Sequence, residues 1–301
     1  MPGCKRINKG AIIGGIFDRR DELVDILHQG PERTNQSDPA QPSCWRLKRI
    51  RTAVAWLNDY SLSGVWRVLQ RYGLKLRTAQ VQQYSPDPKY QQKEAHLLAC
   101  LRKTAQQPDQ RVFLFLDEMG YYCWPDTTKV WAEVAPSAPP LADRQQAKQQ
   151  QWRLIGALNA LTGQVDYLDN YIVGRAKVID MYQLIVDRYA HYDHIFVAQD
   201  NWSIHKHADV EAALQRLPRI EPVWLPTYAP WLNPIEKLWR WLRQDVLKMH
   251  RLAAHWSRLR HKVNTFLDQF SAGSQALLRY VGLAGYGKLA SAIRAASLPF
   301  S

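Results

Sequence analysis

The apolar residues between positions 45 and 77 recur at helical spacing in two short groups. The first group is Leu47, Ile50, Val54 and Leu57, and the second is Val65, Val68 and Leu69. The polar stretch "NDYSLS" separates the groups, and Ser63 and Gly73 suit the start and the end of the second helix. Two short helices joined by a tight turn predict a helix-turn-helix module over residues 45–90.

Further along the chain, the apolar residues form short continuous runs, which are typical of buried strands. Residues 112–116 and 195–198 are such runs. An amphipathic stretch over residues 91–110 predicts a linker helix. The strand and helix patterns over residues 111–275 predict a mixed α/β layer fold. Residues 276–301 are then expected to be a C-terminal tail.

Residues 1–44 contain the polar, proline-rich stretch "GPERTNQSDPAQPS". This composition predicts a poorly ordered or atypical N-terminal segment. The N-terminus also lacks a convincing signal peptide, and no apolar run approaches the roughly 20 residues of a membrane helix. The four cysteines fit no zinc or disulfide spacing, so they are expected to be reduced thiols in a cytoplasmic protein.

The formal net charge of the 301 residues is +13, and basic residues are dense in the predicted helix-turn-helix module. Such a charge favours a polyanionic partner, most often nucleic acid. One acid, Asp59, accompanies eight basic residues, which are the candidate DNA contacts: Arg46, Lys48, Arg49, Arg51, Arg67, Arg71, Lys75 and Arg77. A basic, solvated helix pair without a partner is the alternative.

Three acids occupy comparable places after apolar runs. Asp117 and Asp200 each follow a predicted strand, and Glu236 begins the helix after the next strand. Because ligands gather at the carboxyl ends of strands in open α/β sheets, these acids are candidates for one cleft. Converging carboxylates repel each other unless cations neutralise them, and Mg²⁺ prefers oxygen ligands. Each acid taken alone has a structural alternative, as the end of a strand or part of a turn.

The alternative for Glu236 is a helix cap. Asn233 suits the N-cap, Pro234 the first helical position, and Glu236 the capping-box position. We expect Glu236 both to cap this helix and to carry chemistry. The apolar positions of the helix share one face: Ile235, Leu238, Trp239, Leu242 and Val246.

The segments "FLDEMGYYCWP", "FVAQDNWSIHK" and "LPTYAPWLNPIEKLW" resemble the signature blocks of DDE transposases of the mariner superfamily, in its bacterial insertion-sequence branch. The resemblance covers about residues 111–250. It implies an RNase H-like mixed sheet flanked by helices, preceded by the small all-α module. It also implies that Asp117, Asp200 and Glu236 are catalytic and bind two Mg²⁺ or Mn²⁺ ions.

Asn201 and His205 match family positions that accompany the second acid, and Glu118 follows the first. Apart from the resemblance, Lys237, Arg240 and Arg243 are candidates for holding phosphates beside Glu236, and a solvated basic face is an equally good alternative. Family members usually carry two helix-turn-helix units, and residues 1–44 do not match the first.

The function implied is cut-and-paste transposition of double-stranded DNA by a homodimer on DNA, in the cytoplasm and near the nucleoid. The alternatives are a DNA-binding protein that has lost transposition and a nonspecific RNase H-like nuclease.

Overall fold

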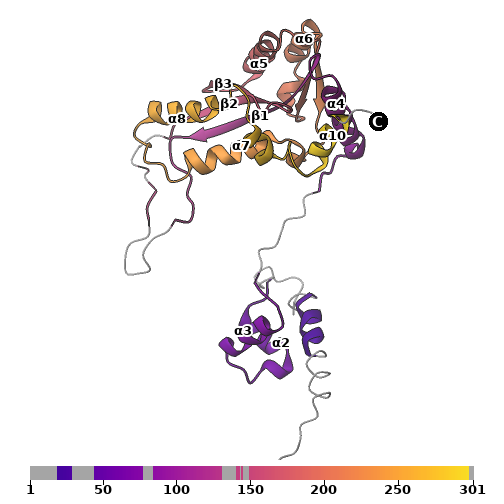
Figure 1. The fold of residues 1–301 in the computed structure, drawn as a ribbon. Helices are drawn as coiled ribbons and strands as arrows, with labels where there is room; N and C mark the ends of the chain where they lie inside the picture. The colour runs from indigo at the N-terminus through magenta and orange to yellow at the C-terminus, as the bar shows by residue number, and fades with distance from the viewer. Residues whose placement is uncertain are drawn as a thin grey trace, which may run out of the picture. The chain divides into compact units, whose positions relative to one another are not determined.

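The computed structural model describes residues 19–28, 44–76, 84–130, 140–142, 144 and 149–297. The chain divides into two compact units, Met1–Val81 and Gln82–Ser301 (Figure 1). None of the described helices is long and apolar enough to cross a membrane.

The smaller unit contains helices and no strands among its described residues. Its elements are a helix over residues 19–28, α2 (Leu47–Ala53), the short 3₁₀ helix η1 (Ala55–Leu57) and α3 (Leu62–Arg71). The predicted apolar groups supply most of its buried core, and Leu47 and Val68 pack against it partly buried. The buried residues are Ile50, Val54, Leu57, Val65 and Leu69, together with Leu23, which was not predicted. The cap of α3 is Ser61 rather than Ser63, because the Ser61 hydroxyl accepts a hydrogen bond from Gly64 N at 3.1 Å. The chain leaves the helix through Gly73 at φ 76°, as the sequence predicts.

The N-terminal segment differs from its expected poor order, because residues 19–28 belong to this core. Leu23 is fully buried. Trp56 Nε1 donates to Glu22 Oε2 at 3.0 Å, and Trp45 Nε1 donates to Leu27 O at 3.1 Å. The two tryptophans therefore tie this helix to the helix pair. Residues 1–18 and 29–43 lie outside the described residues.

The larger unit begins with a long helix and a sheet. Along the chain its elements are α4 (Tyr90–Gln106), β1 (Arg111–Tyr122), β2 (Gln151–Asn159), β3 (Val165–Asn170), α5 (Arg175–Arg188), β4 (His194–Gln199), η2 (Ser203–Lys206), α6 (Ala208–Arg216), β5 (Ile220–Trp224), η3 (Pro230–Leu232), α7 (Ile235–Leu242), η4 (Arg243–Leu247), α8 (Trp256–Asp268), α9 (Gln275–Val281) and α10 (Lys288–Ser297). The predicted mixed α/β fold is confirmed.

The five strands form one sheet in the order β3-β2-β1-β4-β5. Strands β1, β2 and β3 are antiparallel neighbours, whereas β4 runs parallel to both β1 and β5. Helices α5 and α6 pack against one face of the sheet, and α7 and α8 contribute to the core on the other face. Figure 1 shows α5 and α6 above the sheet and α7 below it. Alternate residues of β1 enter the two cores, with Phe113 and Phe115 on the α7 face and Leu114 and Leu116 on the α5 face.

The segment over residues 84–90 packs on the larger unit, although the predicted helix-turn-helix module extends to residue 90. The Asp87 carboxylate accepts hydrogen bonds from Lys93 Nζ at 2.8 Å and from Thr227 N at 3.0 Å. Ser85 Oγ donates to Thr227 O at 2.6 Å. These polar contacts, which no periodic pattern reveals, move the boundary to about residue 81.

The C-terminal residues also differ from the expected tail. Helices α9 and α10 contribute Leu277, Leu278 and Leu289 to the core on the α7 face. Lys288 Nζ on α10 donates to Glu94 Oε1 on α4 at 2.8 Å. The apolar residues of these helices are spread over two short segments, so their packing partner is evident only in the folded chain.

Candidate active site

The register of the parallel strands brings Asp117 beside Asp200. The β1–β4 pairing ends with Phe115 opposite Ala198, and two further residues along each chain lead to the two aspartates. Strand β1 itself does not end there, because it continues to Tyr122 paired with β2. The prediction that Asp117 ends its strand is therefore wrong in a specific way: Asp117 lies where β4 stops, not where β1 stops.

Asp117 faces α7, since it has the same parity along β1 as Phe113 and Phe115. Trp239 on α7 donates from its indole Nε1 to Asp117 Oδ2 at 3.0 Å. The same helix begins at Ile235 and carries Glu236 in its first turn. Helix α7 therefore both supplies the third acid and holds the first.

A glycine makes room for this indole. Gly156 on β2 lies directly opposite Asp117 in the ladder. A Cβ atom at Gly156 would lie 2.7 Å from Trp239 Cη2, a distance that real Cβ atoms essentially never show. The bare backbone at this position therefore lets the ring reach Asp117.

The side chain of Asn233 does not cap α7 as predicted. Its amide Nδ2 instead donates to Leu116 O at 3.1 Å, and no side-chain cap hydrogen bond is formed at the start of α7. Beyond Phe115, β1 has lost β4 as a neighbour, and the buried Asn233 amide binds the strand there. The contact ties the start of α7 to the residue that precedes Asp117. The predicted buried face is confirmed at all five positions, four of them on α7 and one, Val246, on the π-helix η4 that follows.

Asp117, Asp200 and Glu236 line one cavity of about 490 Å³. Burial, followed by the charges of Glu236, Glu118 and Asp200, raises the pKa of Asp117 from 3.8 to about 8. Burial also raises the pKa of Glu236, and Asp200 adds to this shift while Arg240 and Arg243 oppose it. The cavity therefore concentrates negative charge that a cation would stabilise.

The three carboxylates are spaced more widely than the ligands of a single ion. Within the part of the chain that the structure describes, one group brings three possible ligand atoms within 4.8 Å of each other, and it consists of His96, Cys100 and Glu221.

The predicted neighbours of the acids gather around Asp200. His205 is buried, with its Nε2 3.3 Å from Glu118 Oε1 and 3.7 Å from Asp200 Oδ1. Asn201 Nδ2 donates to Leu225 O at 2.7 Å. Glu118 projects from β1 on the side opposite to Asp117, so His205 connects it to Asp200 around the end of β4.

The three basic residues predicted beside Glu236 have different surroundings. Lys237 Nζ donates to Val281 O at 2.8 Å, and Arg243 donates to Asp126 Oδ2 at 3.2 Å and to Gly120 O at 3.0 Å. These contacts hold α7 against neighbouring segments. Arg240 is exposed.

In the smaller unit, the basic candidates lie at or near the surface. Arg46, Lys48, Arg67, Arg71 and Lys75 are exposed, and Arg49 and Arg51 are half-buried. The indole of Trp66, which precedes Arg67 on α3, is 53% exposed. Arg77 lies outside the described residues.

Sequence reasoning missed three features of the site. The sequence offered an indication of the Trp239 hydrogen bond, since position 239 follows Glu236 by one helical turn and faces the same side. It also offered an indication of the role of Gly156, since a glycine inside a strand often marks a close approach of other atoms. No sequence pattern indicated Tyr228, which lines the cavity with a φ of 53°.

Residues 112–260 match the family described as DDE superfamily endonuclease. This segment is a DDE superfamily endonuclease domain. A protein of insertion element IS630 from Shigella sonnei, described as an uncharacterized 39 kDa protein, is 28% identical to the chain over 122 residues. The match covers 40% of this chain and 35% of that protein, so the chain spans about a third of its relative. The predicted family resemblance is confirmed.

Solved structures share the fold of the chain. The Mos1 transposase paired-end complex with left transposon end has a TM-score of 0.62 at 15% identity, covering 99% of this chain and 80% of that chain. The Mos1 mariner paired end complex with Mn has a TM-score of 0.60 at 14% identity, and the match covers 100% of this chain and 82% of that chain. The corresponding complex with Mg has a TM-score of 0.59 at 14% identity, and the match covers 100% of this chain and 83% of that chain. The DDE domain therefore has the predicted RNase H-like architecture.

Proposed function

We propose that this chain is a DNA transposase that cleaves the ends of a mobile element and joins them to target DNA. The observation that carries the proposal is the convergence of Asp117, Asp200 and Glu236 on one cavity of a DDE superfamily endonuclease domain. Water attack on a phosphodiester, followed by attack of the freed 3′-hydroxyl on a second duplex, needs no covalent protein intermediate.

Divalent cations fit the donor set of this cavity. Asp117, Asp200 and Glu236 offer only carboxylate oxygens, which suit Mg²⁺ and Mn²⁺. Burial, followed by the charges of Glu236, Glu118 and Asp200, raises the pKa of Asp117, and a bound cation would favour its charged form. Two ions are the number that the family resemblance implies. When bound, such ions activate the attacking oxygen and stabilise the leaving oxygen of a phosphodiester.

The protein's own contacts orient these acids. The Trp239 indole donates a hydrogen bond to Asp117 Oδ2. The backbone N–H of Trp202 donates to Asp200 Oδ1 at 2.9 Å. Carboxylates held in this way would present their oxygens to an ion in a fixed arrangement, which favours a reaction that depends on positioning. We also propose that Arg240, which is exposed and one helical turn from Glu236, neutralises a phosphate of the bound DNA.

Double-stranded DNA is the proposed partner of both units. The exposed basic residues of the smaller unit supply sequence-independent phosphate contacts, so binding should weaken steeply with salt. Substituting both Arg67 and Arg71 with alanine should lower the slope of log affinity against log salt by about 2. Pairing of two element ends supports a homodimer on DNA.

The decisive experiment is cleavage of duplexes that carry the element's own terminal repeats, with Mg²⁺ or Mn²⁺. We expect Asp200→Asn to abolish cleavage and to leave DNA binding largely intact. The control is Asp187→Asn, which changes an exposed acid on α5. Full cleavage by Asp200→Asn would overturn the proposal.

The same assay separates the alternatives. A DNA-binding protein that has lost transposition would bind the repeats without cutting them under any metal condition. A nonspecific nuclease would cut unrelated duplexes or RNA–DNA hybrids as readily as the repeats.

A further inference from the structure

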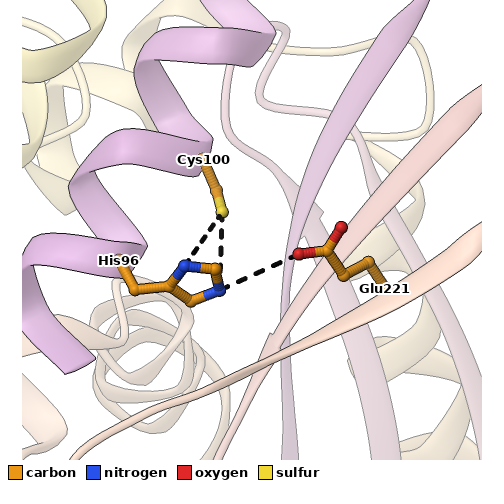
Figure 2. A group of neighbouring side chains, drawn as sticks. All are labelled: His96, Cys100 and Glu221. Atoms are coloured by element: carbon orange, nitrogen blue, oxygen red, sulfur yellow. Dashed lines mark hydrogen bonds and ion pairs between the residues drawn. The ribbon is translucent and has the colours of Figure 1, made fainter. Parts of the chain in front are cut away.

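A second cluster of metal-ligating side chains lies in the larger unit, on helix α4 and strand β5 (Figure 2). His96 and Cys100 are one turn apart on α4 and therefore share a face. Cys100 Sγ lies 3.7 Å from His96 Nε2 and 3.9 Å from its Nδ1. Glu221 of β5 places Oε1 3.9 Å from His96 Nε2. Each of the three residues presents a ligand atom within 4.8 Å of the other two.

We propose that His96, Cys100 and Glu221 form a zinc site, separate from the carboxylate cavity. Zinc accepts thiolate, imidazole and carboxylate ligands together, whereas Mg²⁺ takes oxygen ligands. Zn–S bonds of ~2.3 Å and Zn–N bonds of ~2.0 Å at a tetrahedral angle place neighbouring ligand atoms ~3.3 to 3.6 Å apart. His96 Nε2 lies 3.7 Å from Cys100 Sγ and 3.9 Å from Glu221 Oε1, slightly more than these values. Small side-chain rotations would therefore complete the coordination.

Glu221 is already oriented for this role. Its second oxygen, Oε2, lies 2.8 Å from Nε2 of His194 on the neighbouring strand β4. A ligand carboxylate that is hydrogen-bonded at one oxygen presents the other oxygen in a fixed direction. His194 therefore acts as a positioning residue that directs Oε1 toward His96.

The burial of the cluster matches a site that opens to water on one side. Cys100 is 1% exposed, whereas the side chains of His96 and Glu221 are 48% and 42% exposed. An ion at this place would have three protein ligands, and the fourth position would go to a water molecule.

Zinc binds the thiolate form of cysteine, so binding at Cys100 would displace the thiol proton. One proton would be released for each ion bound, and zinc affinity should therefore rise with pH.

The ion would tie helix α4 to an edge strand of the sheet. Strand β5 has β4 as its neighbour on one side and no strand on the other among the described residues. Its C-terminal end leads into Leu225 and Thr227, which line the carboxylate cavity. A ligand that binds the folded chain and not the unfolded chain raises the unfolding temperature. A zinc ion here would stabilise β5, the strand that leads into the cavity lining.

The test uses the full chain, stripped of metal and then dialysed against Zn²⁺ with excess Mg²⁺ present. We expect one zinc per chain and a higher unfolding temperature. Both His96→Gln and Cys100→Ala should weaken zinc binding by at least ~100-fold, and His194→Gln should weaken it about 10- to 100-fold. Co²⁺ in place of zinc should give a thiolate-to-metal charge-transfer band that Cys100→Ala removes.

Two controls make the result specific. Cys44→Ala changes an exposed cysteine of the smaller unit and should leave zinc affinity unchanged. Asp200→Asn should also bind zinc normally, so failure of the zinc site is distinguishable from failure of the proposed transposase activity. His96→Gln alters an exposed side chain and should fold normally, as circular dichroism without metal would verify. Absence of stoichiometric zinc, or full zinc binding by His96→Gln and Cys100→Ala, would overturn the proposal.

Discussion

A single methyl group added at Gly156 should disturb Asp117 without changing any acid of the cavity. In Gly156→Ala, the new Cβ would lie 2.7 Å from Trp239 Cη2 and 3.0 Å from Cζ2, whereas ordinary contacts begin at 3.4 Å. The difference of 3.4 − 2.7 Å requires the ring to move by about 0.7 Å. Trp239 is 4% exposed, so the surrounding core resists this movement.

The displacement has two expected consequences. Overpacking of this kind costs about 1–3 kcal/mol of unfolding free energy. It also lengthens the 3.0 Å bond from Trp239 Nε1 to Asp117 Oδ2 beyond hydrogen-bonding range. A misplacement near 1 Å can cost on the order of 100-fold in rate, so we expect end cleavage to fall about 10- to 100-fold while DNA affinity is unchanged.

Gly120→Ala is the matched control for this prediction. Gly120 lies on β1, three residues after Asp117, and the nearest atom to a Cβ there is Trp152 O at 3.9 Å. We expect its stability in urea unfolding to stay within about 0.5 kcal/mol of the parent, with normal cleavage. Trp239→Phe combined with Gly156→Ala should recover stability but not cleavage, because phenylalanine is smaller and has no N–H donor. Equal stability and cleavage for Gly156→Ala and Gly120→Ala would refute the reasoning.

Three further predictions concern the pKa of Asp117, the core around Leu23, and the basic residues beside Glu236. The folded-state pKa of Asp117 is raised from 3.8 to about 8, so the unfolded chain loses this proton first. The metal-free protein should therefore lose a few kcal/mol of stability as pH rises from about 4 to 8, and Asp117→Asn should flatten this slope in urea unfolding. Leu23→Ala should lower the free energy of unfolding of the smaller unit by about 2–5 kcal/mol, measured by tryptophan fluorescence. A loss of stability below about 0.5 kcal/mol would show that residues 19–28 do not belong to this core. Lys237→Met should lower the free energy of unfolding by about 1 kcal/mol, because the bond to Val281 O is lost, and should leave DNA affinity unchanged. Arg240→Met should instead lower the slope of log DNA affinity against log salt by about 1, without loss of stability. A reduced slope for Lys237→Met and not for Arg240→Met would contradict the structure.

The position of the acids relative to the strands could be predicted only in part. The apolar runs before Asp117 and Asp200 correctly indicated two buried strands and the edge at which the acids meet. They did not indicate that β1 continues to Tyr122, because a strand's length depends on its partners. Strand β2 accompanies β1 past Asp117, while β4 leaves it at Phe115. Such pairing is tertiary information that no local period contains.

The cap predicted at Asn233 failed for a related reason. The local sequence satisfied every rule for a side-chain cap. In the folded chain, however, the amide binds Leu116 O, a partner far away in sequence. A short polar side chain forms whichever hydrogen bond relieves the more buried group, and this choice depends on tertiary contacts. The buried stripe of α7 was predictable because it depends on helical period alone.

The contacts around Asp117 also explain how the chain tolerates three acids in one cavity. Burial and mutual repulsion raise the pKa of Asp117 and Glu236, so this convergence opposes folding. Two hydrogen bonds counteract this cost: the Trp239 indole donates to the Asp117 carboxylate, and the Asn233 amide donates to the carbonyl of Leu116. Both donors belong to the segment that carries Glu236, so the bonds that offset the repulsion are also those that bring two acids together. Loss of either donor should therefore weaken metal binding even where the three carboxylates remain.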